Sequence, residues 1–227
     1  MKKTTYKITP IPFEGDVKSD HMFPLPIRCL IVGASGCGKT TSLWNLITKD
    51  WIPFKNLYVF TKSLEQKSYQ ILKGLYESIE LKEGSKIAHF YNNCEDIISV
   101  EECEPNSLIV FDDCILEKQD PIKSYYTRGR HKNISCIYLS QCYSLVDLKV
   151  IRNNINFLCL FKQNKHYTRK VYDDFVGSEM PLEKFFNITS NCWKEKFGFL
   201  CVDMTKSIEE GKYKCKFDST YFGHDQS

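Results

Sequence analysis

The sequence predicts an α/β protein with a mostly parallel β-sheet and helices on both of its faces. Between residues 27 and 176, short apolar runs alternate with longer stretches in which apolar and polar residues follow a helical period. Uninterrupted apolar runs are typical of strands buried on both faces, and the helices between them provide the crossovers of a parallel sheet. The length of 227 residues suits a single domain.

The elements are predicted in chain order from these periods and from the positions of glycine and proline. Residues 1–26 carry several prolines and little periodicity, and they are interpreted as an extended N-terminal arm before one domain at 27–227. Strands are predicted at 27–32, 56–61, 86–91, 107–112, 134–140 and 155–161, and helices at 40–49, 65–79, 121–128, 145–152 and 167–176. Two further segments, "KFGFLCVDM" and "KYKCKFDS", predict a C-terminal β-hairpin joined by "TKSIEEG".

A glycine-rich loop follows the first predicted strand. The segment "GASGCGKT" matches G-x-x-x-x-G-K-[ST], the phosphate-binding P-loop, and lies between the strand "IRCLIV" and the helix "TTSLWNLITK". Its glycines allow the backbone N–H groups to turn inward around a polyphosphate, and the N-terminus of the helix adds its dipole. The residues expected to contact the nucleotide are Gly33, Ala34, Ser35, Gly36, Cys37, Gly38, Lys39, Thr40 and Thr41.

Two side chains of this loop have specific predicted roles. Lys39 brings a positive charge to the β- and γ-phosphates, and the hydroxyl of Thr40 is expected to bind Mg²⁺. A chance match to an ordinary glycine-rich turn is the alternative, but the flanking strand and helix favour a P-loop. ATP and Mg²⁺ are therefore the predicted ligands.

The predicted strand in "NSLIVFDDC" ends in two acidic residues. A buried strand with an acid at its carboxyl end is typical of a Walker B element, in which Asp112 would hold the Mg²⁺ shell near Thr40. Asp113 would then stand where many P-loop ATPases carry a glutamate that activates water. The alternative interpretation is a strand that ends in an acidic turn.

The next strand, in "ISCIYLSQ", ends at Gln141. Parallel sheets bind ligands at the carboxyl ends of their strands, so this amide could orient water or sense the γ-phosphate, or it could cap backbone groups instead. A P-loop, an acid-tipped strand and a polar-tipped strand, each separated by a helix, are typical of the additional-strand, RecA-like P-loop NTPases.

A basic turn precedes that strand in "YYTRGRHKNI", with Arg128, Arg130, His131 and Lys132. One interpretation is a solvated basic turn. The other is an arginine finger, which would reach the γ-phosphate bound by a neighbouring subunit.

The composition restricts the class of protein. A net charge of +3 does not by itself indicate a nucleic-acid binder. Eleven cysteines are scattered without any C-x-x-C pair, which predicts free core thiols in a reducing compartment and argues against a zinc site. No secretory signal and no apolar run of membrane-spanning length are present, so a soluble intracellular protein is expected.

Together these motifs carry a family resemblance. Between residues 27 and 162, the chain resembles the genome-packaging ATPases of the FtsK–HerA superfamily in "GASGCGKT", "LIVFDD", "GRHKNISCIYLSQ" and "IRNNINFLCLFK". Within it, the chain is most similar to the poxvirus-type branch of large eukaryotic DNA viruses, virophages and Polinton-like elements. The resemblance implies Arg130 as the finger, with Arg128 or Arg152 as substitutes, and Gln141 as the sensor. The usual Walker B glutamate is replaced here by the shorter Asp113.

The resemblance also implies a function and its partners. Members of this family resemble ring-forming motors that move double-stranded DNA into a preformed capsid, so DNA, capsid or portal-vertex proteins and further copies of the chain are the expected partners. The isolated chain could be monomeric. The expected location is the host cytoplasm or a virus factory, with association with the virion as a further option. The alternatives are a nucleoside or nucleotide kinase and a nucleotide-binding scaffold with little hydrolysis.

Residues that contact DNA are not specified by the sequence. The segment "FKQNKHYTRK" at 161–170 interleaves basic and aromatic residues and could grip phosphates. It could equally be the solvated face of an amphipathic helix.

Overall fold

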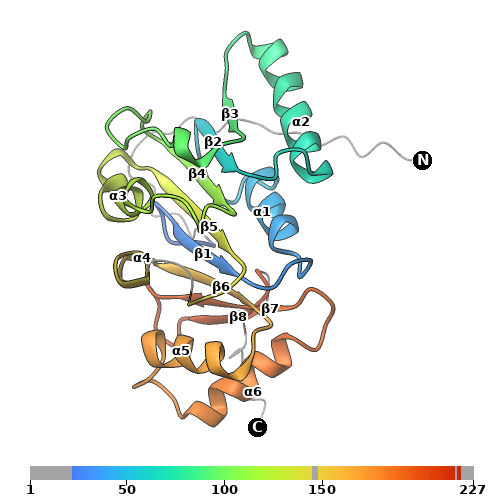
Figure 1. Cartoon of the computed structure of the whole chain (residues 1–227). Coiled ribbons are helices and arrows are strands. Elements are labelled where there is room, and N and C mark those ends of the chain that lie inside the picture. Colours follow the sequence, from blue (N-terminus) through green and yellow to red (C-terminus); the bar gives the residue numbers. More distant parts are fainter. Residues whose placement is uncertain (1–21, 145–147, 218, 221–227) are drawn as a thin grey trace, which may run out of the picture.

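A computed structural model of the chain describes residues 22–144, 148–217 and 219–220 (Figure 1). They form one nine-stranded sheet in the order β3-β2-β4-β5-β1-β6-β7-β8-β9. The strands are β1 (Arg28–Val32), β2 (Asn56–Thr61), β3 (Ala88–Tyr91), β4 (Ser107–Asp112), β5 (Ser135–Ser140), β6 (Phe157–Phe161), β7 (Phe199–Asp203), β8 (Tyr213–Cys215) and β9 (Ser219–Thr220).

The helices lie on both faces of the sheet, as predicted. They are α1 (Lys39–Thr48), α2 (Lys67–Glu83), α3 (Asp120–Arg128), α4 (Leu148–Asn154), α5 (Lys165–Phe175) and α6 (Leu182–Cys192), with short 3₁₀ turns η1 (Cys94–Asp96) and η2 (Gly129–Lys132). Helices α1 and α2 share a core cluster with one face, and α3, α4, α5 and α6 share a cluster with the other (Figure 1). No helix among the described residues is long and apolar enough to cross a membrane.

The strand order confirms the predicted fold class. The six strands from β3 to β6 pair in parallel, whereas β6–β7, β7–β8 and β8–β9 pair antiparallel. Strand β1, which leads into the P-loop, is separated from the acid-tipped strand β4 by β5. This intervening strand distinguishes the additional-strand NTPases, and the C-terminal hairpin extends the same sheet.

Most of the predicted elements are found, and the differences are local. The helix α6 was not predicted, and the expected helix at 145–152 begins in residues outside the described part, with α4 extending to Asn154. The expected N-terminal arm falls mostly on residues 1–21, which are also outside the described part. The arm and the domain limits therefore stay predictions.

The expectation that the cysteines are free is wrong for Cys114, which is disulfide-bonded, and for Cys192 and Cys215. Cys192, at the end of α6, forms a disulfide with Cys215 of β8, with 5.2 Å between their Cα atoms. The two residues lie 23 positions apart, and only the return of β8 beside β7 brings them together. Buried free thiols of the expected kind are Cys29, Cys103, Cys136, Cys159 and Cys201.

Candidate nucleotide site

The P-loop connects β1 to α1, as the sequence predicted. Gly36 has a φ angle of 74° and Gly38, the N-cap of α1, has a φ angle of 105°. L-residues with side chains rarely adopt this left-handed region, so glycine is the natural residue at both positions. The loop can therefore curl over the N-terminus of α1, where backbone N–H groups lack helical acceptors and an anion can bind.

Gly33 is required for a different reason, which is close packing. A Cβ atom at this position would lie 2.4 Å from Sγ of Cys37 and 2.5 Å from Cβ of Phe161 on β6. The backbone N–H of Gly33 also donates to the carbonyl oxygen of Ser140 on β5, at 3.1 Å. The start of the loop is thus fixed between the two strands that flank β1.

Lys39 folds back over its own loop. Its Nζ donates to the carbonyl oxygens of Gly33 at 2.6 Å and Ala34 at 3.0 Å. Both contacts hold the ammonium group beside the N-terminus of α1. A bound polyphosphate would meet this charge without a large movement of the side chain.

A cleft of about 450 Å³ opens over the loop. Its lining residues are Ser35, Gly36, Gly38, Lys39, Thr40, Thr41, Ser63, Gln66, Asp112, Asp113, Gln141 and Phe197. The structure therefore brings together the P-loop, both predicted acids and the predicted glutamine. Ser63, Gln66 and Phe197 were not anticipated, whereas Gly33, Ala34 and Cys37 belong to the loop without lining the cleft.

Asp112 is largely buried at the end of β4. Burial raises the pKa of its carboxyl group, and the hydrogen bond from Tyr69 and the charge of Lys39 oppose this shift. The Tyr69 hydroxyl donates to Oδ2 of Asp112 at 2.5 Å and so orients the carboxylate. A nearby cation would offset the cost of keeping this buried group ionised.

Asp112 and Thr40 both line the cleft and both carry oxygen ligands. Mg²⁺ prefers such a set, with one or two carboxylates completed by substrate phosphates and water. No cluster of three or more His, Cys, Asp or Glu exists among the described residues that would suggest a different metal. The donor set therefore fits Mg²⁺ bound together with a nucleotide.

Asp113 and Gln141 stand at the rim of the cleft with exposed side chains. Asp113 has a φ angle of 58°, which turns the chain away from the strand direction directly after Asp112. Aspartate tolerates this conformation better than most residues. Two adjacent acids consequently occupy different environments, one buried against Tyr69 and one accessible to water.

The three candidate arginines differ in their partners. Arg128 forms an ion pair with Glu101 at 2.6 Å, and Arg152 forms one with Asp174. Arg130 is exposed and makes no ion pair within the part of the chain that the structure describes.

Arg130 lies away from the cleft of its own chain. The turn η2 precedes β5, and the carbonyl oxygen of Lys132 in this turn accepts a hydrogen bond from Asn106, the residue before β4, at 3.0 Å. These contacts place η2 at the amino ends of the parallel strands, whereas the cleft lies at their carboxyl ends. The structure therefore does not bring Arg130 together with Lys39, Asp112 and Gln141.

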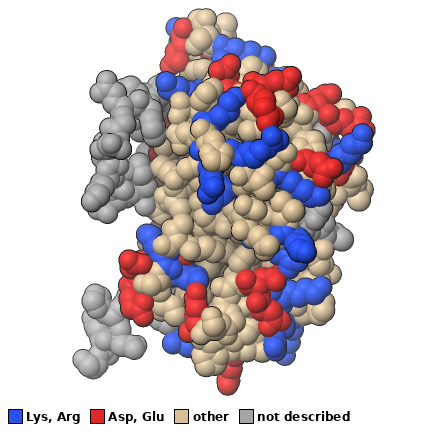
Figure 2. Space-filling model, turned by 90° about the vertical axis from the view of Figure 1, so that its left-hand side faces the viewer, with Lys and Arg blue, Asp and Glu red and all other residues tan. Residues whose placement is uncertain are grey.

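The face of the molecule drawn in Figure 2 carries charges of both signs. Figure 2 shows the side of the molecule on which α3 and α4 lie in Figure 1, and there Lys and Arg are interspersed with Asp and Glu. The basic segment at 161–170 continues into α5, where Arg169 forms an ion pair with Asp173 at 2.9 Å.

Comparison with known proteins shows the family. The model of the family described as poxvirus A32 protein matches residues 14–216. The chain belongs to the poxvirus A32 protein family. Proteins that are similar to the chain include the "DNA packaging protein OPG160" of vaccinia virus (strain Copenhagen) and that of monkeypox virus, each 27% identical and aligned over 65% of this chain. The alignments span 57% and 52% of those proteins, so the chain covers little more than half the length of these relatives.

Solved structures agree with the fold of the A32 family member described here. The genome packaging NTPase B204 of Sulfolobus turreted icosahedral virus 2, in complex with sulfate, has a TM-score of 0.57 at 10% identity. The comparison covers 82% of this chain and 94% of that protein. The same NTPase in complex with AMPPCP gives a TM-score of 0.56, with 84% and 97% covered. At this identity the likeness establishes the fold alone.

Proposed function

We propose that this protein is an Mg-dependent ATPase that moves double-stranded DNA into a viral or virus-like capsid. One observation carries the proposal: a single cleft contains the P-loop, an oriented buried acid, an exposed acid and a glutamine. Its membership of the A32 family, with relatives described as DNA packaging proteins, supports DNA as the object that is moved.

The proposed roles follow from position. The P-loop from Gly33 to Thr41 holds the phosphates, Lys39 neutralises the β- and γ-phosphates, and Thr40 and Asp112 hold Mg²⁺. Bound there, the cation would neutralise charge that develops on the phosphates.

Asp113 is accessible to water and is proposed to orient or deprotonate the attacking water. Gln141, on the next strand end, is proposed to sense the γ-phosphate. These roles use the difference in environment between Asp112 and Asp113, since only the exposed acid is free to meet water.

The arginine is proposed to come from a neighbouring subunit. Arg130 lies at the opposite end of the strands from its own P-loop and has no ion-pair partner among the described residues. Head-to-tail contacts that place one end of the sheet against the other close into a ring when the rotation between neighbouring copies allows it. Each nucleotide would then sit between two copies of the chain, which act in the host cytoplasm or virus factory together with a capsid or portal-vertex protein.

One set of assays tests the proposal against its alternatives. Phosphate release from Mg-ATP is measured with and without duplex DNA, and in parallel with nucleosides as acceptors. A translocase should be stimulated by duplex DNA of any sequence, and its DNA binding should weaken steeply with salt because the contacts are to phosphates. Transfer of the γ-phosphate to a nucleoside would indicate a kinase, and nucleotide binding without hydrolysis would indicate a scaffold.

A further inference from the structure

An aromatic side chain at the nucleotide cleft has no role in the mechanism above. Phe197 lies in the loop between α6 and β7, and the residue is 53% exposed. Its φ angle of 62° falls in the left-handed region, where a bulky residue is an outlier. Such strain concentrates at functional sites. We propose that Phe197 is the platform on which the nucleobase of the bound nucleotide stacks, an inference that rests on the proposed function and adds its base subsite.

Phe197 packs directly against the P-loop. A Cβ atom placed on Gly38 would lie 3.3 Å from both Cβ and Cδ1 of Phe197. Phe197 also lines the same cleft as Lys39 and Asp112. The exposed ring is therefore part of the wall of the nucleotide cleft.

The strand order gives the direction in which a bound nucleotide would point. Strand β4, which carries Asp112, and strand β7, which follows Phe197, lie on opposite sides of β1. A triphosphate whose γ-phosphate meets Asp113 at one end of the P-loop therefore directs its base toward the other end. Phe197 is the aromatic residue that lines the cleft there.

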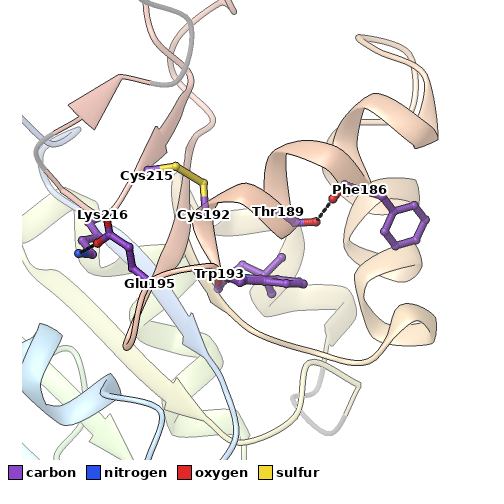
Figure 3. Close-up of a disulfide and its surroundings, with 8 residues drawn as sticks. Phe186, Thr189, Cys192, Trp193, Glu195, Cys215 and Lys216 are labelled. Carbon is purple, nitrogen blue, oxygen red and sulfur yellow. Dashed lines mark hydrogen bonds and ion pairs between the residues drawn. A yellow bond between two sulfur atoms is a disulfide. The ribbon is translucent and has the colours of Figure 1, made fainter.

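The residues just before Phe197 anchor its loop. The Trp193 indole Nε1 donates to the carbonyl oxygen of Leu160 at 3.0 Å. Glu195 forms an ion pair with Lys216 next to the disulfide between Cys192 and Cys215 (Figure 3). These contacts fix the loop before the nucleotide binds, which lowers the entropy cost of ordering a binding surface.

Close packing also fixes the residue after Phe197. A Cβ atom on Gly198 would lie 2.0 Å from the carbonyl oxygen of Cys192, so the backbone passes here where no side chain fits. The turn is thereby held in the conformation that presents the ring of Phe197 outward. The backbone of the loop therefore sets the position of the ring, which is not buried in the core.

A phenyl ring recognises the base by its flat face. Stacking is available to every base and does not read hydrogen-bonding edges, so the larger purines should be favoured over pyrimidines with little discrimination between ATP and GTP. The ammonium of Lys196 lies 5.0 Å from the centroid of the ring. Because such a contact is weak at an exposed site, a base can take its place.

The test compares the binding of a ligand that carries a nucleobase with the binding of a ligand that has none. Calorimetric titration of Mg-ATP and of Mg-tripolyphosphate is performed on the full chain, wild type and Phe197→Gly, at concentrations where it is monomeric. The glycine variant should bind Mg-ATP about tenfold more weakly. Its affinity for Mg-tripolyphosphate should be unchanged. Its melting temperature should not fall, because glycine accepts the left-handed backbone without strain.

A second variant gives a spectroscopic readout. Phe197→Trp should retain the affinity for Mg-ATP, and its additional indole emission, measured against the wild type, should be quenched by Mg-ATP but not by Mg-tripolyphosphate. Quenching by both ligands would show a loop movement and would overturn stacking.

The remaining outcomes are distinct. Unchanged ATP affinity in Phe197→Gly overturns the inference, and so does an equal loss for tripolyphosphate, which would mean that the residue shapes the P-loop. Loss of ring assembly with unchanged ATP affinity would assign Phe197 to a subunit interface and also overturns it. If the wild type binds neither ligand, the proposed function itself fails.

Discussion

The two ends of the parallel strands carry opposite halves of the proposed chemistry. At the carboxyl ends, which we call the nucleotide end, lie the P-loop, Asp112, Asp113 and Gln141 around one cleft. At the amino ends, which we call the arginine end, η2 presents the exposed Arg130. The nucleotide end is built from closely packed and hydrogen-bonded residues, whereas Arg130 stands without an ion pair among the described residues.

This difference suggests that ATP hydrolysis depends on the assembly of several copies of the chain. An arginine that served the fold would be expected to have a partner, as Arg128 has in Glu101 and Arg152 has in Asp174. An arginine that serves a neighbour has to remain available until the neighbour arrives. The predictions below test this division, beginning with the largest expected effect.

Removing the positive charge of Lys39 at the nucleotide end should have the largest effect on ATP binding and hydrolysis. In Lys39→Ala, the β- and γ-phosphates lose their main cation, so nucleotide binding should weaken strongly and hydrolysis should become undetectable. Binding is measured by calorimetry and turnover by phosphate release. Lys49→Ala, at the other end of α1, is the control and should behave as the wild type. Near-normal hydrolysis in a folded Lys39→Ala protein would remove the P-loop assignment.

Arg130→Ala should lower the turnover of ATP on the order of a thousandfold, while ATP binding in the isolated chain stays normal. The matched control is Arg128→Ala, since Arg128 is exposed and its ion pair with Glu101 contributes little. Mixing Arg130→Ala with Lys39→Ala should restore part of the activity, because some interfaces then join an intact P-loop to an intact arginine. Absence of rescue where rings are seen would place the finger elsewhere or in the same chain.

The two adjacent acids should separate binding from hydrolysis. Asp113→Asn is expected to keep Mg-ATP bound and to lower turnover by about a hundredfold or more, because the amide cannot accept a proton from water. Asp112→Asn should weaken the part of ATP binding that depends on Mg²⁺. Titration of ATP with and without Mg²⁺ checks both variants. The reverse pattern would exchange the two roles.

The smallest expected effect concerns stability at the nucleotide end. The disulfide joins residues 23 positions apart. Its reduction should lower the free energy of unfolding by roughly 3 kcal/mol, by the loop-entropy model. Chemical denaturation with and without a reductant measures this change. The double variant Cys192→Ser/Cys215→Ser is the control, and an equal effect of reductant on that variant would exclude this bond as the cause.

The sequence specified the nucleotide end well because its signals are local. The P-loop needs glycines at fixed spacing in eight consecutive residues. The buried strand that ends in Asp112 can likewise be recognised from a few consecutive residues. The cleft joins them because parallel strands bring their carboxyl ends to one edge, which follows from the alternation of strands and helices. The roles of the individual side chains stay predictions.

Other features depend on contacts that no short window contains. The helix α6 was missed although its buried residues Phe185, Ile188 and Cys192 follow a helical spacing, since Thr189 and its polar neighbours have weak helix propensity. The disulfide could not be selected among eleven cysteines. Nothing near Phe197 in the sequence indicates that its loop returns to the P-loop, because this contact depends on the antiparallel pairing of β7 with β6.

The position of β1 in the middle of the sheet has a consequence for when the protein becomes able to bind ATP. Leu30 of β1 pairs with Tyr138 on one side and with Leu158 on the other. Both partners lie more than a hundred positions later in the sequence, so β1 cannot pair until they have been synthesised. Chains are synthesised from the N-terminus, and contacts of such long sequence separation form slowly. A ribosome-bound chain that has not yet reached Ser135 would lack both strands that flank β1, and one that has not yet reached Phe157 would still lack β6. The first molecule of ATP held by a new chain would thus mark the completion of its central sheet.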